Sequence, residues 1–215
     1  MLSLIAIAKN EAAGIQEFLK YHRSLFDEQV VLDTGSTDAT SELARQAGAR
    51  VVDYQWQDDF AAARNASLRA ATGDWALVLD VDERIAIQDF DEIRALTEGH
   101  QCCYLFQQRN YYNRSEHQEW QPVTGQYPEL ERGYAGYFAA EQHRLFPVHP
   151  GLQWQGCVHE DMSASIGRTG LASRLIDIPI HHYGYVLSDA TNRRRNKFYG
   201  KLVRKKFAAS RSDPG

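Results

Sequence analysis

The amino-acid sequence predicts an α/β fold in which helices flank a mainly parallel central sheet. Over the first 100 residues, apolar runs of strand length alternate with segments of helical periodicity. The runs are apolar on consecutive residues, which is typical of strands buried on both faces, and each run ends on polar residues. At 215 residues, the chain is long enough for one domain or for two closely fused lobes.

Strands and helices are expected to alternate from the N-terminus. The expected strands are residues 2–8, 29–33, 50–54 and 75–80, and the expected helices are residues 14–26, 39–47 and 60–72. Ser36 or Thr37 can cap the second helix, and Gly48 stands where a left-handed glycine ends it. Gly73 follows the third helix in the same way.

The character of the sequence changes near residue 100. A weak helix is expected at 89–99, followed by β segments at 102–113, 137–148 and 175–185 that extend the same sheet. From residue 188 to about 209, an apolar stripe is opposed by a row of basic residues. This pattern predicts an amphipathic C-terminal helix.

Composition and charge argue against a membrane-spanning, secreted or nucleic-acid-binding protein. The first apolar stretch is too short to span a bilayer and lacks the basic segment of a signal peptide. Three cysteines form neither a disulfide framework nor a CxxC pair, so a reduced, cytoplasmic protein is expected. The basic C-terminal segment indicates an anionic partner, but the chain lacks the aromatic–basic interleaving of nucleic-acid binding proteins.

Two carboxylates follow the fourth expected strand, in "ALVLDVDERI". Asp80 and Asp82 point in opposite directions if the segment is extended, so one can hold a divalent cation while the other meets a ligand hydroxyl or a metal-bound water. Mg²⁺ and Mn²⁺ favour such sparse sites, which water and substrate phosphates complete. A diphosphate ligand is therefore implied. Acidic residues are also common at solvated strand ends, so this motif alone is a weak signal.

Four blocks together are more specific. "SLIAIAKNEA", "VVLDTGSTDAT", "DDFAAARNASL" and "GDWALVLDVDERI" resemble, in order and spacing, the family 2 glycosyltransferases of GT-A fold. The nearer resemblance is to the bacterial branch that contains lipopolysaccharide core glucosyltransferases and SunS-like enzymes, which "GCVHEDM" and "IHHYGY" also fit. The resemblance extends from Ser3 to about Tyr185. Members of this branch often continue into helical repeats.

The resemblance implies a Rossmann-like sheet with a β-rich acceptor half. Residues 1–100 would form the half that binds a nucleotide-sugar, residues 101–187 the half that binds the acceptor, and residues 188–215 a basic helix and tail. By the same resemblance, Asp82 would ligate the metal and Asp80 would meet the ribose or sugar of the donor. Glu83 would support them or be merely solvated.

Four further residues match donor-site positions of the family. Asp33 matches an acid that faces the base or ribose, although it can also cap the helix that follows. Arg64 matches an arginine that bridges base and diphosphate by charge-assisted hydrogen bonds, with a surface arginine as the alternative. Asn10 and Glu11 are expected to line the pocket or to cap the first helix.

The later blocks supply the expected base and a second metal ligand. Glu160 is the general base implied by the resemblance, with Asp161 as its rival and a loop salt bridge as the alternative role. His182 matches a histidine that can join Asp82 as a ligand of Mg²⁺ or Mn²⁺, while His181 should point the other way. Arg144 is expected to contact phosphate or acceptor.

These expectations describe an inverting, metal-dependent glycosyltransferase. Its donor would be a nucleotide-diphosphate sugar, with UDP as the commonest nucleotide, and its acceptor a lipid-linked saccharide of the cell envelope such as lipopolysaccharide core. The basic C-terminal helix would contact an anionic membrane, peripherally at the inner membrane, or cap the domain. Transfer to a peptide side chain, as in SunS-like enzymes, and a non-catalytic nucleotide-sugar-binding module are the alternatives.

Overall fold

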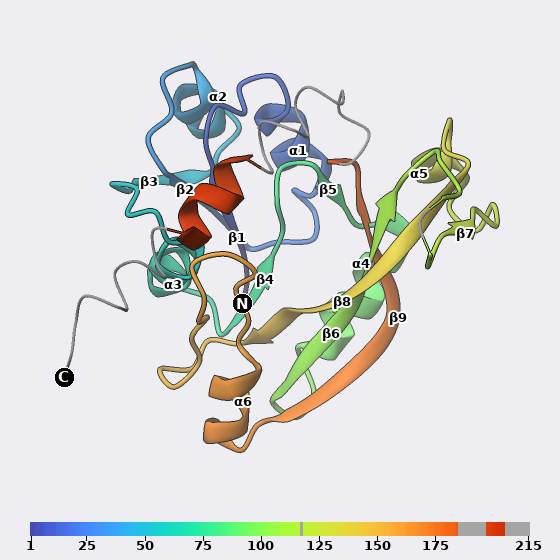
Figure 1. The fold of residues 1–215 in the computed structure, drawn as a ribbon. Helices are drawn as coiled ribbons and strands as arrows, with labels where there is room; N and C mark the ends of the chain where they lie inside the picture. Colours follow the sequence, from blue (N-terminus) through green and yellow to red (C-terminus); the bar gives the residue numbers. More distant parts are fainter. Residues whose placement is uncertain (117, 185–196, 205–215) are drawn as a thin grey trace.

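A nine-stranded sheet runs through the protein, and helices cover it on both faces (Figure 1). The computed structural model describes residues 1–116, 118–184 and 197–204. The strand order is β3-β2-β1-β4-β8-β6-β9-β5, and β7 pairs with β8. This architecture confirms the predicted α/β fold with a central sheet.

The first half contains the parallel part of the sheet. β1, β2 and β4 lie where consecutive apolar residues predicted buried strands, and β3 forms the outer strand. All three pairings among these strands are parallel. The elements are β1 (Leu2–Ala8), α1 (Ile15–Tyr21), β2 (Glu28–Asp33), α2 (Thr40–Gln46), β3 (Arg50–Asp53), α3 (Phe60–Ala70) and β4 (Trp75–Val78).

The second half extends the same sheet as predicted, but its strands run in both directions. β4 pairs antiparallel with β8, and β8 pairs antiparallel with β6, whereas β6 and β9 are parallel. The sheet as a whole is therefore mixed rather than mainly parallel. The elements are β5 (Glu83–Arg84), α4 (Phe90–Leu96), β6 (Cys102–Tyr111), β7 (Gln121–Pro122), α5 (Pro128–Glu131), β8 (Gly136–Pro147), α6 (Ser163–Thr169) and β9 (Ala172–His182).

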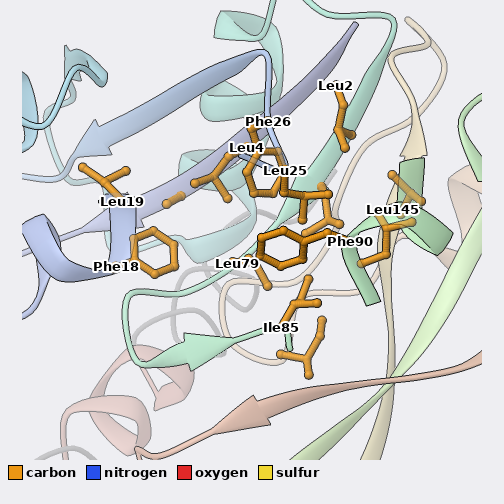
Figure 2. Packing of buried hydrophobic residues seen from close by; sticks show 14 of the residues in the cluster. Leu2, Leu4, Phe18, Leu19, Leu25, Phe26, Leu79, Ile85, Phe90 and Leu145 are labelled. Carbon is orange, nitrogen blue, oxygen red and sulfur yellow. The ribbon is translucent and has the colours of Figure 1, made fainter. Parts of the chain in front are cut away.

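Alternate residues of each buried strand supply two separate cores. Leu2 and Leu4 of β1 face the core that α1, α2 and α4 complete, whereas Ile5 faces the core under α3 and α6. Figure 2 shows the first of these cores, where Phe18 and Leu19 of α1 approach the strand residues. Burial of both faces holds the ends of β1 and β4 in fixed positions.

Local signals at the helix ends were partly misleading. Gly48 is left-handed at φ +89°, as predicted, but α2 begins at Thr40 without a side-chain cap, so Ser36 and Thr37 do not cap it. Gly73 is not left-handed: a Cβ there would lie 2.6 Å from Ser3 Oγ and 2.8 Å from Met1 O. The glycine is needed because two backbone segments pass close together.

The C-terminal segment is described only in part. Residues 197–204 are helical, and Leu202 is buried against the domain, while the rest of the predicted helix lies outside the described residues. In Figure 1 this short red helix lies beside α3, which agrees with the ring contact between Phe60 and Tyr199. Packing of this part favours the capping role that the sequence left open. None of the helices in the described part of the chain has the length and apolarity needed to span a bilayer.

Candidate active site

A polar cavity of about 950 Å³ opens beyond the carboxyl ends of β1 and β4. Residues of both halves of the chain line it, from β1 and β4 in the first half to β6, β8 and β9 in the second. This is the edge of the sheet where ligands of open α/β folds bind. The cavity brings together most of the predicted site residues: Glu11, Arg64, Asp80, Asp82, Arg144, Glu160, Asp161 and His182.

Arg64 connects two of the predicted carboxylates. Its Nη2 donates to Oδ1 and Oδ2 of Asp80 at 3.0 and 3.1 Å, and its Nε donates to Oε1 of Glu160 at 2.7 Å. Burial alone would raise the pKa of Asp80, but the charges of Arg64, Arg144 and His182 outweigh it and hold that pKa below its usual value. The alternative of a surface arginine is wrong, because Arg64 is only 8% exposed.

Glu83 fixes the turn that carries the two aspartates. Its Oε2 accepts from the backbone amide of Asp80 at 2.8 Å, and its own amide donates to the Asp80 carbonyl at 3.0 Å. Its Oε1 accepts from Arg144 Nη2 at 2.7 Å and from Gln108 Nε2. Glu83 is fully buried, so it is not a solvated acid. Arg144, which was expected to contact phosphate or acceptor, uses Nη2 to bind Glu83.

Asp82 and His182 are in contact in the wall of the cavity. Asp82 Oδ2 lies 3.3 Å from His182 Nε2, and a Cβ on Gly184 would lie within 2.6 Å of both atoms. Asn110 Oδ1 lies 2.6 Å from His182 Nδ1. Because the Asn110 amide nitrogen donates to the carbonyls of Gln108 and Phe138, its oxygen must face the imidazole, so His182 Nδ1 carries a proton.

If His182 is neutral, this arrangement brings two electron-rich atoms into contact. A neutral His182 directs the lone pair of Nε2 at the Asp82 carboxylate, which is stable only with a proton or a cation between them. Burial lowers the pKa of His182, but the hydrogen bond and charge of Asp82 raise it more. The carboxylate suits Mn²⁺ or Mg²⁺, and the imidazole is a better ligand for Mn²⁺ than for Mg²⁺. Among the described residues, no group of three or more His, Cys, Asp or Glu side chains is placed to hold a metal, so other ligands would have to come from water or substrate.

Glu11 and Asp161 line the same cavity in different roles. Desolvation, followed by the charges of Asp82, Asp80 and Asp38, raises the pKa of Glu11 to about 7. Asp161 accepts from the amide and hydroxyl of Ser163, both at 2.9 Å, at the start of α6. Its carboxylate therefore holds the loop after the "VHED" segment.

Asn10 and Asp33 do not line this cavity. Asn10 Oδ1 accepts from the amide of Thr37 at 2.8 Å, which ties together the loops after β1 and β2. Asp33 Oδ1 accepts from the amides of Gly35 and Ser36 at 2.9 and 2.7 Å, and its Oδ2 accepts from Ser41 Oγ. Asp33 borders a separate hollow of about 330 Å³, so its predicted contact with the donor stays a prediction.

Sequence reasoning missed two groups of residues in the cavity wall. Gln108 and Asn110 sit two residues apart on β6, so both side chains lie on one face of the strand, and this spacing was the available signal. Trp56, Phe60 and Tyr199 also line the cavity, although Tyr199 is distant in sequence from the other two. No motif connects them.

Known proteins resemble this chain in sequence. The model of a family described as "Glycosyl transferase family 2" matches residues 3–157. A TPR repeat-containing protein of Synechococcus elongatus is 33% identical over 190 residues, which cover 86% of this chain and 42% of that protein. Glycosyltransferase SunS of the Bacillus subtilis SPbeta prophage is 24% identical over 181 residues, covering 83% of this chain and 38% of SunS. The chain thus spans less than half the length of these relatives.

A solved structure resembles the fold over most of the chain. Glucosyl-3-phosphoglycerate synthase from Mycobacterium tuberculosis, in complex with phosphoglyceric acid, has a TM-score of 0.57 at 22% identity and covers 86% of this chain and 72% of its own. The same synthase has also been solved with Mn²⁺, UDP and glucosyl-3-phosphoglycerate, with a TM-score of 0.54 at 19% identity, 94% coverage of this chain and 77% of that chain. At this identity, the likeness establishes the fold.

Proposed function

Because the chain belongs to glycosyl transferase family 2, we propose that it transfers a sugar from a nucleotide-diphosphate sugar to a hydroxyl acceptor, with inversion at the anomeric carbon. The observation that carries the proposal is the convergence of Arg64, Asp80, Asp82, Glu160 and His182 on one cavity. A non-catalytic binding module is a poorer account. Burying an arginine between two carboxylates costs desolvation free energy, and such charge clusters are typical of active sites.

The donor diphosphate is assigned to the space beside Asp82 and His182. These two side chains would hold Mg²⁺ or Mn²⁺, which supplies neutralisation of the charge that develops on the leaving diphosphate. Arg64 Nη1 is buried and has no hydrogen-bond partner among the described residues, so it is available to donate to a donor oxygen. Asp80, held by Arg64 Nη2, is assigned to a hydroxyl of the ribose or sugar. UDP is the expected nucleotide, the one that the synthase structure contains.

Glu160 is assigned as the general base. Arg64 contacts Oε1, so Oε2 is the oxygen that would accept the proton of the attacking hydroxyl. Asp161 is a weaker candidate, because both of its oxygens are bonded to Ser163.

The acceptor is proposed to be a saccharide of the cell envelope, lipid-linked as in lipopolysaccharide core. The support is the bacterial-branch pattern of "VHEDM" and "HHYGY" together with the basic C-terminal segment, whose peripheral contact with an anionic membrane is part of the proposal. Residues 1–100 would serve the donor and residues 101–187 the acceptor. A peptide acceptor is the second candidate, favoured by the similarity to SunS.

Donor binding is the first test of this function. UDP, GDP, CDP and ADP should be compared by thermal shift with and without Mn²⁺, because a ligand that binds the native state raises its apparent stability. We expect one nucleotide, UDP, to stabilise the protein clearly and only when Mn²⁺ is present. If no nucleotide shifts the transition in either condition, while the protein is folded, the proposal is wrong.

Replacing Asn110 tests the metal assignment without touching a ligand. Asn110→Ala removes the acceptor that keeps the proton on His182 Nδ1, so the Nε2 lone pair is no longer fixed toward Asp82. We expect affinity for Mn²⁺ to fall by about 10- to 100-fold, as measured by calorimetry in the presence of UDP. Gln107→Ala on the same strand is the control. Unchanged Mn²⁺ affinity in Asn110→Ala would remove His182 from the metal site.

A further inference from the structure

An aromatic wall borders the cavity on the side of α3. It consists of Trp56, Phe60 and Tyr199, all of which line the cavity and are half-buried. Trp56 and Phe60 meet edge to face with ring centroids 4.9 Å apart, and Phe60 meets Tyr199 in the same way at 5.7 Å. The wall therefore joins the loop before α3 to the helix of residues 197–204.

The wall is connected through α3 to the residue assigned as the base. Phe60 and Arg64 are four residues apart on α3, so their side chains are neighbours on one helix face, with about 5–6 Å between Cβ atoms. Arg64 in turn holds Glu160 at 2.7 Å. From the other direction, the Phe60 amide donates to the carbonyl of Cys157, three residues before Glu160, at 3.1 Å. A hydroxyl at Glu160 thus brings the rest of its molecule close to these rings.

A hydrogen bond orients one ring of the wall. Trp56 Nε1 donates to Asp58 Oδ1 at 2.9 Å, which sets the plane of the indole ring. The same cavity presents polar groups, among them Asp80, Asp82 and His182. A site lined by both aromatic rings and polar side chains fits a ligand with an apolar face and a rim of hydrogen-bonding groups.

A pyranose ring has this character, because its axial C–H groups form an apolar face and its hydroxyls form a polar rim. We propose that the aromatic wall is the subsite for the acceptor sugar, whose C–H face packs on the rings of Phe60 and Tyr199 while its reacting hydroxyl reaches Glu160. This assignment rests on the proposed function and adds to it the residues that select a saccharide acceptor. It also gives α3 and the C-terminal helix a part in the site, so acceptor binding would not be confined to residues 101–187.

Tyr199 and its neighbour Phe198 provide a matched test. Phe198 lies on the same helix and is 42% exposed. Its ring centroid lies 6.5 Å from that of Trp56, but Phe198 does not line the cavity. The protein saturated with UDP and Mn²⁺ should be titrated, by saturation-transfer NMR, with methyl glucoside, methyl glucosaminide, methyl galactoside, lactose and a short cysteine-containing peptide. Tyr199→Ala, Tyr199→Phe, Phe60→Leu and Phe198→Ala are compared with the unmodified chain.

We expect at least one saccharide to bind, and Tyr199→Ala and Phe60→Leu to weaken its affinity about tenfold. Tyr199→Phe keeps the ring and should restore most of the affinity lost in Tyr199→Ala, whereas Phe198→Ala should bind normally, and UDP affinity should be the same in all variants. Phe60→Leu preserves apolar volume, so the test stands even if Tyr199→Ala fails to fold.

Three results would overturn the assignment. Equal losses in Phe198→Ala and Tyr199→Ala would reduce the wall to a docking surface for the helix. Binding of the peptide and of no saccharide would assign the wall to another acceptor. Failure of every probe to bind, with UDP and Mn²⁺ bound normally, would reject the saccharide subsite and leave the donor function standing. If the unmodified chain does not bind UDP at all, the proposed function is rejected instead.

Discussion

Asp82→Asn is expected to lower sugar transfer by at least about 10³-fold while the protein stays folded. The amide is neutral and a weak metal ligand, so the charge on the departing diphosphate would lose several kcal/mol of stabilisation. Asp82 is 44% exposed in its side chain, and its replacement should change the free energy of unfolding little. Release of UDP from a UDP-sugar, measured with and without Mn²⁺, provides the rate.

The pKa of Glu11 gives a second measurement on Asp82→Asn, and it shows whether the cavity keeps its structure in this variant. The charge of Asp82 contributes to the raised pKa of Glu11, so Asp82→Asn should lower that pKa from about 7. NMR titration of the Glu11 carboxyl follows this change in the absence of metal. Turnover that is equal in Asp82→Asn and the unmodified enzyme, or that persists fully in EDTA, would contradict the metal assignment.

Glu160→Gln is expected to reduce turnover by about 10²- to 10⁴-fold, the usual contribution of a positioned base. The substituted amide would keep a hydrogen bond to Arg64 through its carbonyl oxygen, so the side chains around the donor should move little. Affinity for UDP with Mn²⁺, measured by calorimetry, should therefore stay within a few-fold of the original. The loss should appear in kcat rather than in the KM for the donor.

Asp161→Asn is the matched control for this prediction. Its carboxylate is bonded to Ser163 and holds a loop, so this variant should keep most of its activity. If Asp161→Asn loses activity and Glu160→Gln does not, the two residues exchange roles.

The parallel half of the fold could be predicted because its signals are local. Consecutive apolar residues in β1, β2 and β4 reveal burial on both faces. The antiparallel neighbour of β4 could not be predicted, because its choice of β8 depends on packing between segments about 70 residues apart. Gly73 looks like a helix stop for the same reason: its constraint comes from Met1 and Ser3, which precede it by 72 and 70 residues.

In the candidate site, too, residues in local motifs could be predicted and contacts between distant residues could not. Asp80, Asp82, Arg64, Glu160 and His182 stand in recognisable blocks, and the structure brings all five to one cavity. The supporting contacts are non-local. Glu83 with Arg144 and His182 with Asn110 pair across 61 and 72 residues, and nothing in the sequence around either residue of a pair marks the contact. Their chemistry is visible only once the strands are placed side by side.

A crystal structure grown with Mn²⁺ and UDP, with anomalous diffraction recorded at the manganese edge, would locate the metal and the donor together. We expect an anomalous peak within coordination distance of Asp82 and His182, next to the diphosphate, with Arg64 donating to UDP. A peak elsewhere, or UDP bound without any contact to Asp82, would contradict this expectation.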